Sequence, residues 1–394
     1  MKQILILGGG FAGLEAAIYL KKANFDVTLV SERDYFYVYP TSIWIPTREY
    51  AFEDICIKLE DLANVHKFNY IVDSVASIEA KEKKITLQSG RVMSDYDYLI
   101  VAMGASKISH PGIENTLSIC GAPEQAILIR DKFDALIEKG SGKVCFGFGG
   151  NPHDTSAVRG GPGFELLFNF HNLLKKKGIR KNFELTFFAP MAEPGKRMGP
   201  QALKMMGLFF SKFDIKEHFG KKIKSFQNDG IIFEDDSKLD SDFTMFIPAG
   251  SGHDVIKNSD LPLNPAGFVL TDDFSNVIFE DASMPTNIYA IGDTAALEGY
   301  EWRAKQGHIA EVMARNTAHN IKEREAKGTN FEGYHKHINI LCVMDSGDGA
   351  AFVYRDEKRS FMLPMPFFGH LMKKGWGKYF RASKLGKFPR LPGM

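Results

Sequence analysis

Short apolar runs, each followed by a turn and a helix-length segment, recur along most of the chain. The first run, residues 4–7, predicts a fully buried strand, and a helix is predicted to open at Leu14. A second run, residues 27–30, predicts the next strand. Continuous apolar runs that alternate with helices are typical of parallel strands covered on both faces. The pattern therefore predicts an α/β protein.

The turn between the first strand and the first helix has the spacing G-x-G-x-x-G, formed by Gly8, Gly10 and Gly13. In this motif the first glycine permits a tight turn, the second lets a pyrophosphate approach the backbone, and the third lets helix and strand pack closely. Glu32 follows the second strand, about 20 residues further on, where a carboxylate accepts from an adenosine ribose. The chain therefore has a strand, a glycine turn, a helix, a second strand and an acidic residue in the order of a dinucleotide-binding unit. This order predicts a dinucleotide site.

The same pattern divides the chain into four segments. Residues 1–108 are expected to form the first part of the nucleotide-binding domain, and residues 109–240 a second Rossmann-like domain. Residues 241–325 are expected to return to the first domain. Residues 326–394 form a C-terminal domain.

The second Rossmann-like unit lacks the glycine spacing of the first. Its first strand, residues 143–147, is followed by Gly149 and Gly150, but residues 151–159 separate these from the helix over 161–178. The next strand ends in Ala189-Pro190, with no acid for a ribose. We interpret this as a degraded nicotinamide-dinucleotide site. The alternative is that the insertion reshapes a working site.

The 394 residues carry a formal net charge of +1, but the last acidic residue is Glu357. The cations beyond it are interleaved with aromatic and aliphatic residues, as in an interfacial membrane anchor. Gly375, Gly377 and Pro389 predict short helices here rather than one long helix. Nucleic-acid binding also uses aromatics and cations, and a solvated charged face is a further alternative. The cations are Lys358, Arg359, Lys373, Lys374, Lys378, Arg381, Lys384, Lys387 and Arg390.

The first strand begins at about residue 3, which leaves no room for a signal peptide. No apolar run of 18 residues exists, so no membrane-spanning helix is expected. We therefore expect a peripheral, monotopic protein on the cytoplasmic membrane. The four cysteines, Cys56, Cys120, Cys145 and Cys342, form no C-x-x-C pair, so no metal site is expected.

Three stretches together resemble the two-dinucleotide-fold flavoproteins: residues 8–13 with Glu32, residues 101–104, and residues 289–293. The resemblance covers about 320 residues and implies bound FAD. It also implies that Asp293 bonds the ribitol or pyrophosphate, and that the helix opening at residues 305–307 faces the flavin pyrimidine. A positive helix end and a lysine there stabilise negative charge on reduced flavin. The residues expected to bind the cofactor are Gly8, Gly10, Phe11, Ala12, Gly13, Glu32, Tyr39, Pro40, Val75, Ala102, Met103, Gly104, Gly292, Asp293, Lys305, Gln306 and Gly307.

Finer features resemble the sulfide:quinone oxidoreductases and their flavocytochrome relatives. The aromatic-proline loop over 35–44 is similar to that family's loop beside the flavin. Residues 118–120 and 341–348 are similar to its first and last cysteine sites, and residues 161–165 to its helix start with a glutamate. The conventional middle cysteine is replaced by Arg159. The resemblance implies catalytic roles for Cys342, Cys120 and Glu165, and Cys145 is the only cysteine near the missing position. As a residue inside a predicted buried strand, Cys145 is better explained as a small core residue.

These features predict an FAD-dependent oxidoreductase that oxidises sulfide, or a related sulfur species, and reduces membrane quinone. Thiols would relay the electrons to flavin. Expected partners are quinone, the sulfur substrate and an anionic lipid surface, without nucleic acid; homo-oligomerisation stays open. Phe367, Trp376 and Tyr379 are expected to line the quinone mouth. The alternatives are a type II NADH dehydrogenase and a flavoprotein electron-transfer subunit that acts with a partner chain.

Overall fold

The first domain is built on a parallel sheet. The computed structural model describes residues 1–281 and 283–390. The sheet has the order β19–β9–β1–β2–β5. Its strands are β1 (Gln3–Leu7), β2 (Asp26–Ser31), β5 (Asn69–Val72), β9 (Tyr98–Val101) and β19 (Ile288–Ala290). Every residue of β9 and of β19 is buried, which explains why continuous apolar runs predict the central strands.

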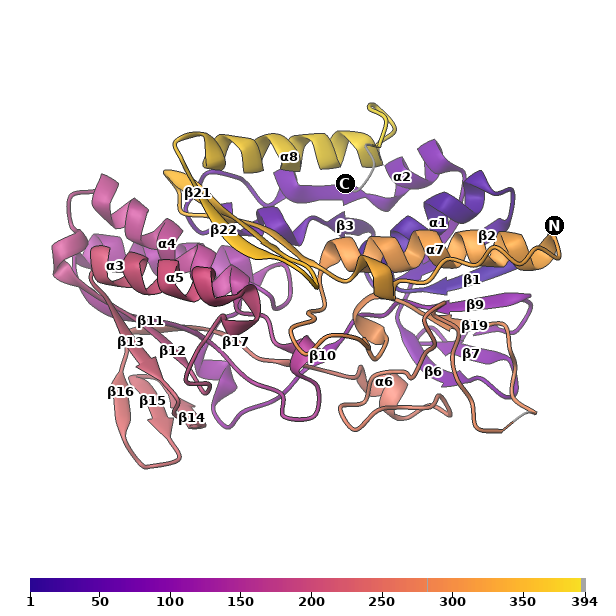
Figure 1. Ribbon diagram of the computed structural model, residues 1–394, viewed down its shortest axis with the longest axis horizontal. Helices are drawn as coiled ribbons and strands as arrows, with labels where there is room; N and C mark the ends of the chain where they lie inside the picture. Colours follow the sequence, from indigo (N-terminus) through magenta and orange to yellow (C-terminus); the bar gives the residue numbers. More distant parts are fainter. Residues whose placement is uncertain (282, 391–394) are drawn as a thin grey trace.

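Helices α1 (Phe11–Lys22) and α7 (Gly307–Glu325) pack against each other along one face of this sheet. The antiparallel sheet of β6 (Val75–Glu79), β7 (Lys84–Leu87) and β8 (Val92–Met93) lies on the other side (Figure 1). A short hairpin of β3 (Tyr35–Tyr37) and β4 (Cys56–Lys58) follows β2, and α2 (Leu59–His66) packs beside it. These elements surround the carboxyl ends of the parallel strands.

The second domain has its own parallel sheet, in the order β13–β12–β11–β17. Its strands are β11 (Gly142–Phe148), β12 (Phe183–Ala189), β13 (Ile215–Phe219) and β17 (Phe243–Ile247). Its helices are α3 (Gln125–Lys139), α4 (Gly161–Lys176) and α5 (Pro200–Lys212). A separate three-stranded antiparallel sheet consists of β14 (Ile223–Gln227), β15 (Gly230–Phe233) and β16 (Lys238–Asp240). Because β17 pairs with β11, the chain leaves this domain only after Ile247, later than the boundary expected at residue 240.

The chain crosses between the two domains on a pair of short antiparallel strands. β10 (Ser106–Lys107) leads into the second domain, and β18 (Gly250–Ser251) leads back. The short helix α6 (Asp254–Lys257) follows on the return side and packs on β6. Residues on this crossing therefore lie between the two parallel sheets.

The C-terminal unit is an antiparallel sheet covered by one helix. Strands β20 (Ile340–Asp345), β21 (Gly349–Arg355) and β22 (Ser360–Pro366) are followed by α8 (Phe368–Lys384), which lies along one side of the molecule (Figure 1). The prediction of short helices is wrong, because α8 runs through both glycines. A glycine costs a helix about 1 kcal/mol relative to alanine. At Gly377 the gain is close packing: a Cβ there would stand 2.8 Å from Cγ2 of Thr41.

Several charged residues of α8 point inward, whereas Phe368, Leu371 and Met372 of the same helix are exposed. Lys373 and Lys384 are buried in ion pairs with glutamates of the body, and Lys374 pairs with Glu49. Phe367, at the start of the helix, has 79% of its surface exposed. This corrects the expectation that the cations of this segment face lipid: Lys358, Arg359, Lys378 and Lys387 are exposed, whereas the other five contact the protein body.

Candidate active site

The glycine turn after β1 combines two close contacts with one open position. Gly8 has a φ of +111°, and a Cβ there would lie 2.3 Å from the carbonyl oxygen of Ala102. A Cβ on Gly13 would lie 1.8 Å from the carbonyl oxygen of Gly8. A Cβ on Gly10 would meet no described atom within 4 Å. Only Gly10 therefore presents a bare backbone to the space beyond, where a phosphate can approach.

A cavity of about 930 Å³ opens at this turn and runs toward the second domain. Its volume lies in the range of about 300–1,000 Å³ that is usual for cofactor pockets. It is lined by every residue predicted to bind the cofactor except Gly13 and Gln306. Gly13 lies behind the turn, and the Gln306 amide instead donates to the carbonyl of Asn339 at 3.2 Å.

The N-termini of α1, α4 and α7 all reach the cavity, through Phe11, Pro162 and Gly307. None of the three carries a side-chain cap. Free N–H groups and the positive ends of the helix dipoles therefore face the same space. This suits a ligand with a pyrophosphate and a ring that becomes anionic on reduction.

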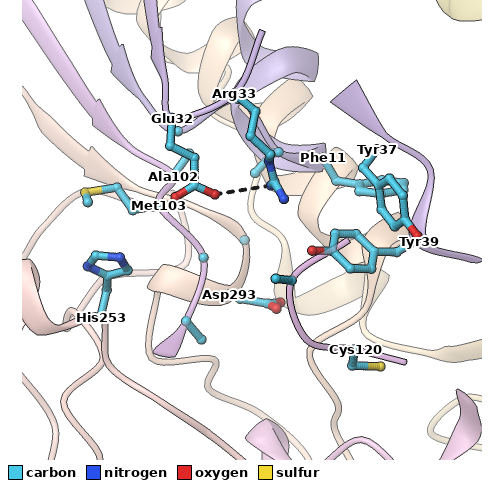
Figure 2. Close-up of a pocket in the computed structure, with 18 of the residues that line it drawn as sticks. Phe11, Glu32, Arg33, Tyr37, Tyr39, Ala102, Met103, Cys120, His253 and Asp293 are labelled. Atoms are coloured by element: carbon cyan, nitrogen blue, oxygen red, sulfur yellow. Dashed lines mark ion pairs between the residues drawn. The ribbon is translucent and has the colours of Figure 1, made fainter. Parts of the chain in front are cut away.

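The end of the cavity at β2 carries the carboxylate that the sequence singles out. Glu32 lines the cavity directly after the strand and forms an ion pair of 3.4 Å with Arg33 (Figure 2). Glu32 is exposed, so its carboxylate can accept from a ribose hydroxyl while it is paired with Arg33. Figure 2 shows Asp293 between this end and Cys120 in the same view.

Asp293 is paired with a residue that sequence analysis noted only as a departure. The guanidinium of Arg159 donates to its carboxylate, and both line the cavity. The Asp293 charge, opposed by burial, raises the pKa of Arg159. The sequence signal was the cation directly before the Gly-Gly-Pro helix start, and its partner was invisible because it lies 134 residues away.

The loop that replaces the second glycine turn carries Arg159 into the cavity. Asn151 accepts from the backbone N–H of His153 at 2.9 Å, and its amide donates to the carbonyl of Gly250. Asp154 caps the short turn that follows by accepting from the backbone of Ser156. A Cβ on Gly160 would lie 2.7 Å from the ring of Phe148. The loop is thus packed and hydrogen-bonded to the crossing strands.

Lys305 supplies a second buried cation. Its ammonium donates to the carbonyl of Ala295 and stands 3.9 Å from the ring centre of Phe268. Burial lowers the pKa of Lys305 to about 8, although Asp293 works in the opposite direction. The lysine therefore sits where it gains from any negative charge that develops in the cavity.

Of the three cysteines predicted to be catalytic, only Cys120 lines the cavity. All four cysteines are free thiols. Cys120 lines the cavity, and burial raises its pKa while Lys107 and Arg159 oppose that rise. Cys342 lies on β20 behind the cavity wall, where burial and the neighbouring Glu165 raise its pKa to about 12.

Cys145 lies elsewhere. Its thiol donates to the carbonyl of Asp240 at 3.8 Å inside β11, within a separate apolar cluster around Phe188 and Phe246. Burial raises the pKa of Cys145 to about 12. It does not border the cavity. Its position speaks against the catalytic role and for the alternative, a small core residue.

Glu165, in the second turn of α4, is buried in a set of contacts that joins the second domain to α8. Its Oε1 accepts from the backbone N–H of Asp345 at 2.8 Å and pairs with Lys373. Burial raises the pKa of Glu165 despite the neighbouring Lys373. The partner Lys373 could not be found from the sequence, since the two are 208 residues apart.

A second set of ion pairs lies next to the first. His370 on α8 holds Asp345 through Nδ1 at 2.7 Å and Glu49 through Nε2 at 3.0 Å. These two carboxylates raise the pKa of His370 to about 9. Trp44 also donates to Asp345, at 3.3 Å. The aromatic loop, β20 and α8 are thereby tied together.

The fold and the cavity define a class of protein: a two-dinucleotide-fold oxidoreductase with one well-formed dinucleotide site. The residues present fit FAD, with a bare Gly10 at a helix N-terminus for the pyrophosphate and Glu32 for the ribose. Asp293 and Lys305 lie further along the same cavity. The chain belongs to the pyridine nucleotide-disulphide oxidoreductase family, whose model matches residues 2–319.

Relatives narrow the class. The chain is 27% identical over 411 residues to the sulfide-quinone reductase of Aquifex aeolicus, covering 96% of this chain and 90% of that protein. It is 23% identical to a type II NADH:quinone oxidoreductase of Staphylococcus saprophyticus, covering 92% and 93%. The crystal structure of the Aquifex aeolicus sulfide:quinone oxidoreductase matches with a TM-score of 0.87 at 25% identity, covering 98% of this chain and 92% of that one. The prediction of an FAD-dependent oxidoreductase related to both enzyme groups is confirmed.

Proposed function

We propose that this FAD-dependent oxidoreductase oxidises sulfide, or a related reduced sulfur species, and passes the electrons to a membrane quinone. The observation that carries the proposal is the free thiol of Cys120 in the cavity wall, flanked by cations. A disulfide formed from two cysteine thiols, with FAD as the two-electron oxidant, would be the acceptor for a sulfur nucleophile, whose attack forms one S–S bond as another breaks. The likeness to the Aquifex aeolicus enzyme supports the same donor and acceptor.

The half-reactions state what the chain must do. Oxidation of hydrosulfide to zero-valent sulfur releases two electrons and one proton, and reduction of a quinone to its quinol takes up two electrons and two protons. Bound FAD supplies the two-electron relay between them. The protein must hold an anionic donor, carry sulfur on a thiol and manage protons beside the acceptor.

Cys342 and Glu165 are the residues we assign to the relay thiol and to proton handling. Glu165 is buried and Cys342 is half-buried, and Glu165 contributes to the raised pKa of the Cys342 thiol. Burial raises the pKa of the Glu165 carboxyl, which favours its protonated form and suits it to exchange a proton with a neighbouring group. Lys373 limits that rise and ties the pair to α8.

The loop that follows the first strand of the second domain is evidence that the electron donor is not NADH. A dinucleotide needs a short glycine turn with bare backbone at a helix N-terminus. Here the packed loop over 149–160 stands in that place, and it delivers Arg159 to the FAD cavity. We therefore assign a single nucleotide to the chain.

An apolar surface on α8 and β22 supports attachment to a membrane. Its residues are Leu363, Phe367, Phe368, Leu371 and Met372, all of them exposed. Within residues 1–281 and 283–390, none of the helices combines the length and hydropathy that a bilayer crossing requires. An apolar stripe of this kind, backed by charges that bind the protein body, suits a helix lying in the lipid interface.

Aromatic rings connect that surface to the cavity. Trp376 packs on Phe380 with ring centres 5.1 Å apart, and Phe380 stacks on Phe11 at 5.6 Å. Phe11 lines the cavity. Of the residues predicted to line the quinone mouth, Trp376 is therefore the best placed. Phe367 stands on the outer surface, and the Tyr379 hydroxyl donates to the carbonyl of Pro389 at 2.9 Å.

An anaerobic titration of the purified yellow protein tests the proposal. Stoichiometric sulfide is expected to bleach the flavin band within seconds, and a short-chain quinone to restore it. NADH at the same concentration is expected to leave the band unchanged. Rapid bleaching by NADH alone would assign the chain to NADH oxidation. No bleaching by either donor would favour an electron-transfer subunit that needs a partner chain.

A further inference from the structure

A cluster of cations surrounds Cys120 at the end of the cavity near the second domain. Lys107 comes from β10 on the domain crossing, and Arg159 comes from the loop before α4. Both side chains line the cavity, as does Cys120. The positive charges of both act on the Cys120 thiol and favour its ionised form. The three residues come from separate segments and meet only in the fold.

Among the described residues, Lys107 has no hydrogen-bonded or ion-paired partner of its own, although the Asp293 carboxylate acts on its charge from a distance. In the described part of the chain, no group accepts a hydrogen bond from its Nζ and no carboxylate pairs with it. Burial, with the Arg159 charge as a further cause, lowers its pKa. A half-buried ammonium without an ion-pair partner would gain free energy from an anion in the cavity.

The neighbouring groups leave this end of the cavity positive. Arg159 is matched by Asp293, and Glu165 is engaged by Lys373. Lys305 donates to a neutral carbonyl rather than to a carboxylate, although Asp293 and Asp154 act on its charge. Lys107 and Lys305 therefore add two positive charges beside the Arg159–Asp293 pair.

The cofactor's phosphates do not account for Lys107. The open backbone for the pyrophosphate is at Gly10 and the N-terminus of α1, on the first sheet. Lys107 lies on the crossing strand, with its charge coupled to Arg159 and Cys120. An anion held by Lys107 would lie beside the thiol.

We infer that Lys107 and Arg159 form an anion-binding subsite beside Cys120, which takes the donor as a small monovalent sulfur anion, either hydrosulfide or a thiolate. The chemical identity of the anion rests on the proposed function, whereas the existence of the subsite does not. Lys107 supplies the free charge, and Arg159 is held in place by Asp293. The subsite concentrates the ionised donor next to Cys120.

Thiocyanate, a monovalent sulfur-containing anion that does not reduce flavin, probes the subsite in the oxidised holoprotein. Its binding is followed by the change in the flavin absorbance spectrum at low chloride, for the parent and for Lys107→Gln and Lys107→Arg. Lys204→Gln, on the exposed face of α5, is the matched control. The dissociation constant is expected to rise at least tenfold in Lys107→Gln and less than threefold in Lys107→Arg and in the control. Flavin content per protein is measured in each variant.

Each outcome bears on one proposal. An unchanged thiocyanate affinity in Lys107→Gln overturns the subsite, and so does a loss of flavin content without a loss of anion affinity, which would assign Lys107 to the cofactor. A tenfold loss of anion affinity in a protein that sulfide does not reduce keeps the subsite and overturns the proposed donor. Arg159→Gln, with exposed Arg91→Gln as its control, is expected to weaken thiocyanate binding in the same direction.

Discussion

Nζ of Lys384 lies 2.5 Å from Oε2 of Glu15, and both side chains are fully buried. Lys384 also pairs with Glu311 at 2.7 Å, and Arg390 contacts both glutamates. Burial alone would raise the pKa of Glu15, but the two cations outweigh it and hold the pKa below its usual value. Glu15 lies on α1 and Glu311 on α7, so the end of the chain stabilises two of the three helices whose N-termini face the cavity.

Lys384→Met is expected to destabilise the protein by about 3–5 kcal/mol, because it leaves two buried carboxylates with one cation. Thermal unfolding of the holoprotein measures the change. Lys387→Met, at an exposed position, is the control and should shift stability by less than about 0.5 kcal/mol. Equal melting temperatures for the two variants would contradict the buried assignment. A truncation that removes residues from 367 onward would also remove Lys384 and its buried ion pairs. It would therefore destabilise the protein and could not test membrane attachment alone.

Stability is expected to fall as the pH rises from about 6.5 to about 9, because His370 is held charged between two carboxylates. Its pKa is raised to about 9, so its contribution is complete below the unfolded value of about 6.5 and is lost as the pH approaches 9. Partial exposure to solvent reduces the effect to about 1–2 kcal/mol. Chemical denaturation at several pH values measures it. In His370→Gln this slope should flatten, and an unchanged slope would point to other groups.

Membrane binding is expected to depend on the apolar face of α8 rather than on its cations. Replacing Phe367, Phe368 and Leu371 by serine should reduce the fraction bound to anionic vesicles by tenfold or more, since burial of each such side chain is worth about 1.5–3 kcal/mol. Vesicle flotation measures the bound fraction. Leu208→Ser, at an exposed site on α5, is the control. Undiminished flotation of the triple variant would rule out this face as the anchor.

Cys342→Ser is expected to abolish flavin reduction by sulfide while FAD stays bound, and Cys120→Ser to slow it by at least tenfold. In Cys145→Ala, sulfide should reduce the flavin at the parent rate, because this thiol lies in a core cluster away from the cavity. Stopped-flow absorbance of the flavin band measures all three. If sulfide failed to reduce the flavin of a Cys145→Ala variant of normal stability, Cys145 would have to take part in the reaction.

Two neighbouring glycines should fail in different ways. Gly13→Ala is expected to destabilise the fold itself, since its Cβ would overlap the carbonyl of Gly8 at 1.8 Å. Gly10→Ala has room in the protein, so its apoprotein should melt normally, but the methyl group would stand where the pyrophosphate approaches. Its FAD affinity should fall at least tenfold. Melting curves with and without added FAD separate the two effects. Normal flavin binding by Gly10→Ala would show that the pyrophosphate does not bind at Gly10.

The sequence alone determined the nucleotide-binding framework of this protein. Buried parallel strands are continuous apolar runs, and the glycine turn needs specific residues at fixed local spacing, so both are visible within a short window of sequence. The absence of that spacing after β11 was visible for the same reason. Cys120 and Glu165, by contrast, were singled out only through resemblance to a family.

Only the tertiary structure decided which distant charges meet. The pairs Arg159–Asp293, Glu165–Lys373 and Glu15–Lys384 join residues separated by 134, 208 and 369 positions. No local pattern distinguishes a lysine that enters a buried pair from one that faces lipid or water, because the difference lies in desolvation by other segments. That is why the cations of α8 were expected on the outside, and why Lys107 became a candidate ligand residue only once the cavity around it was known.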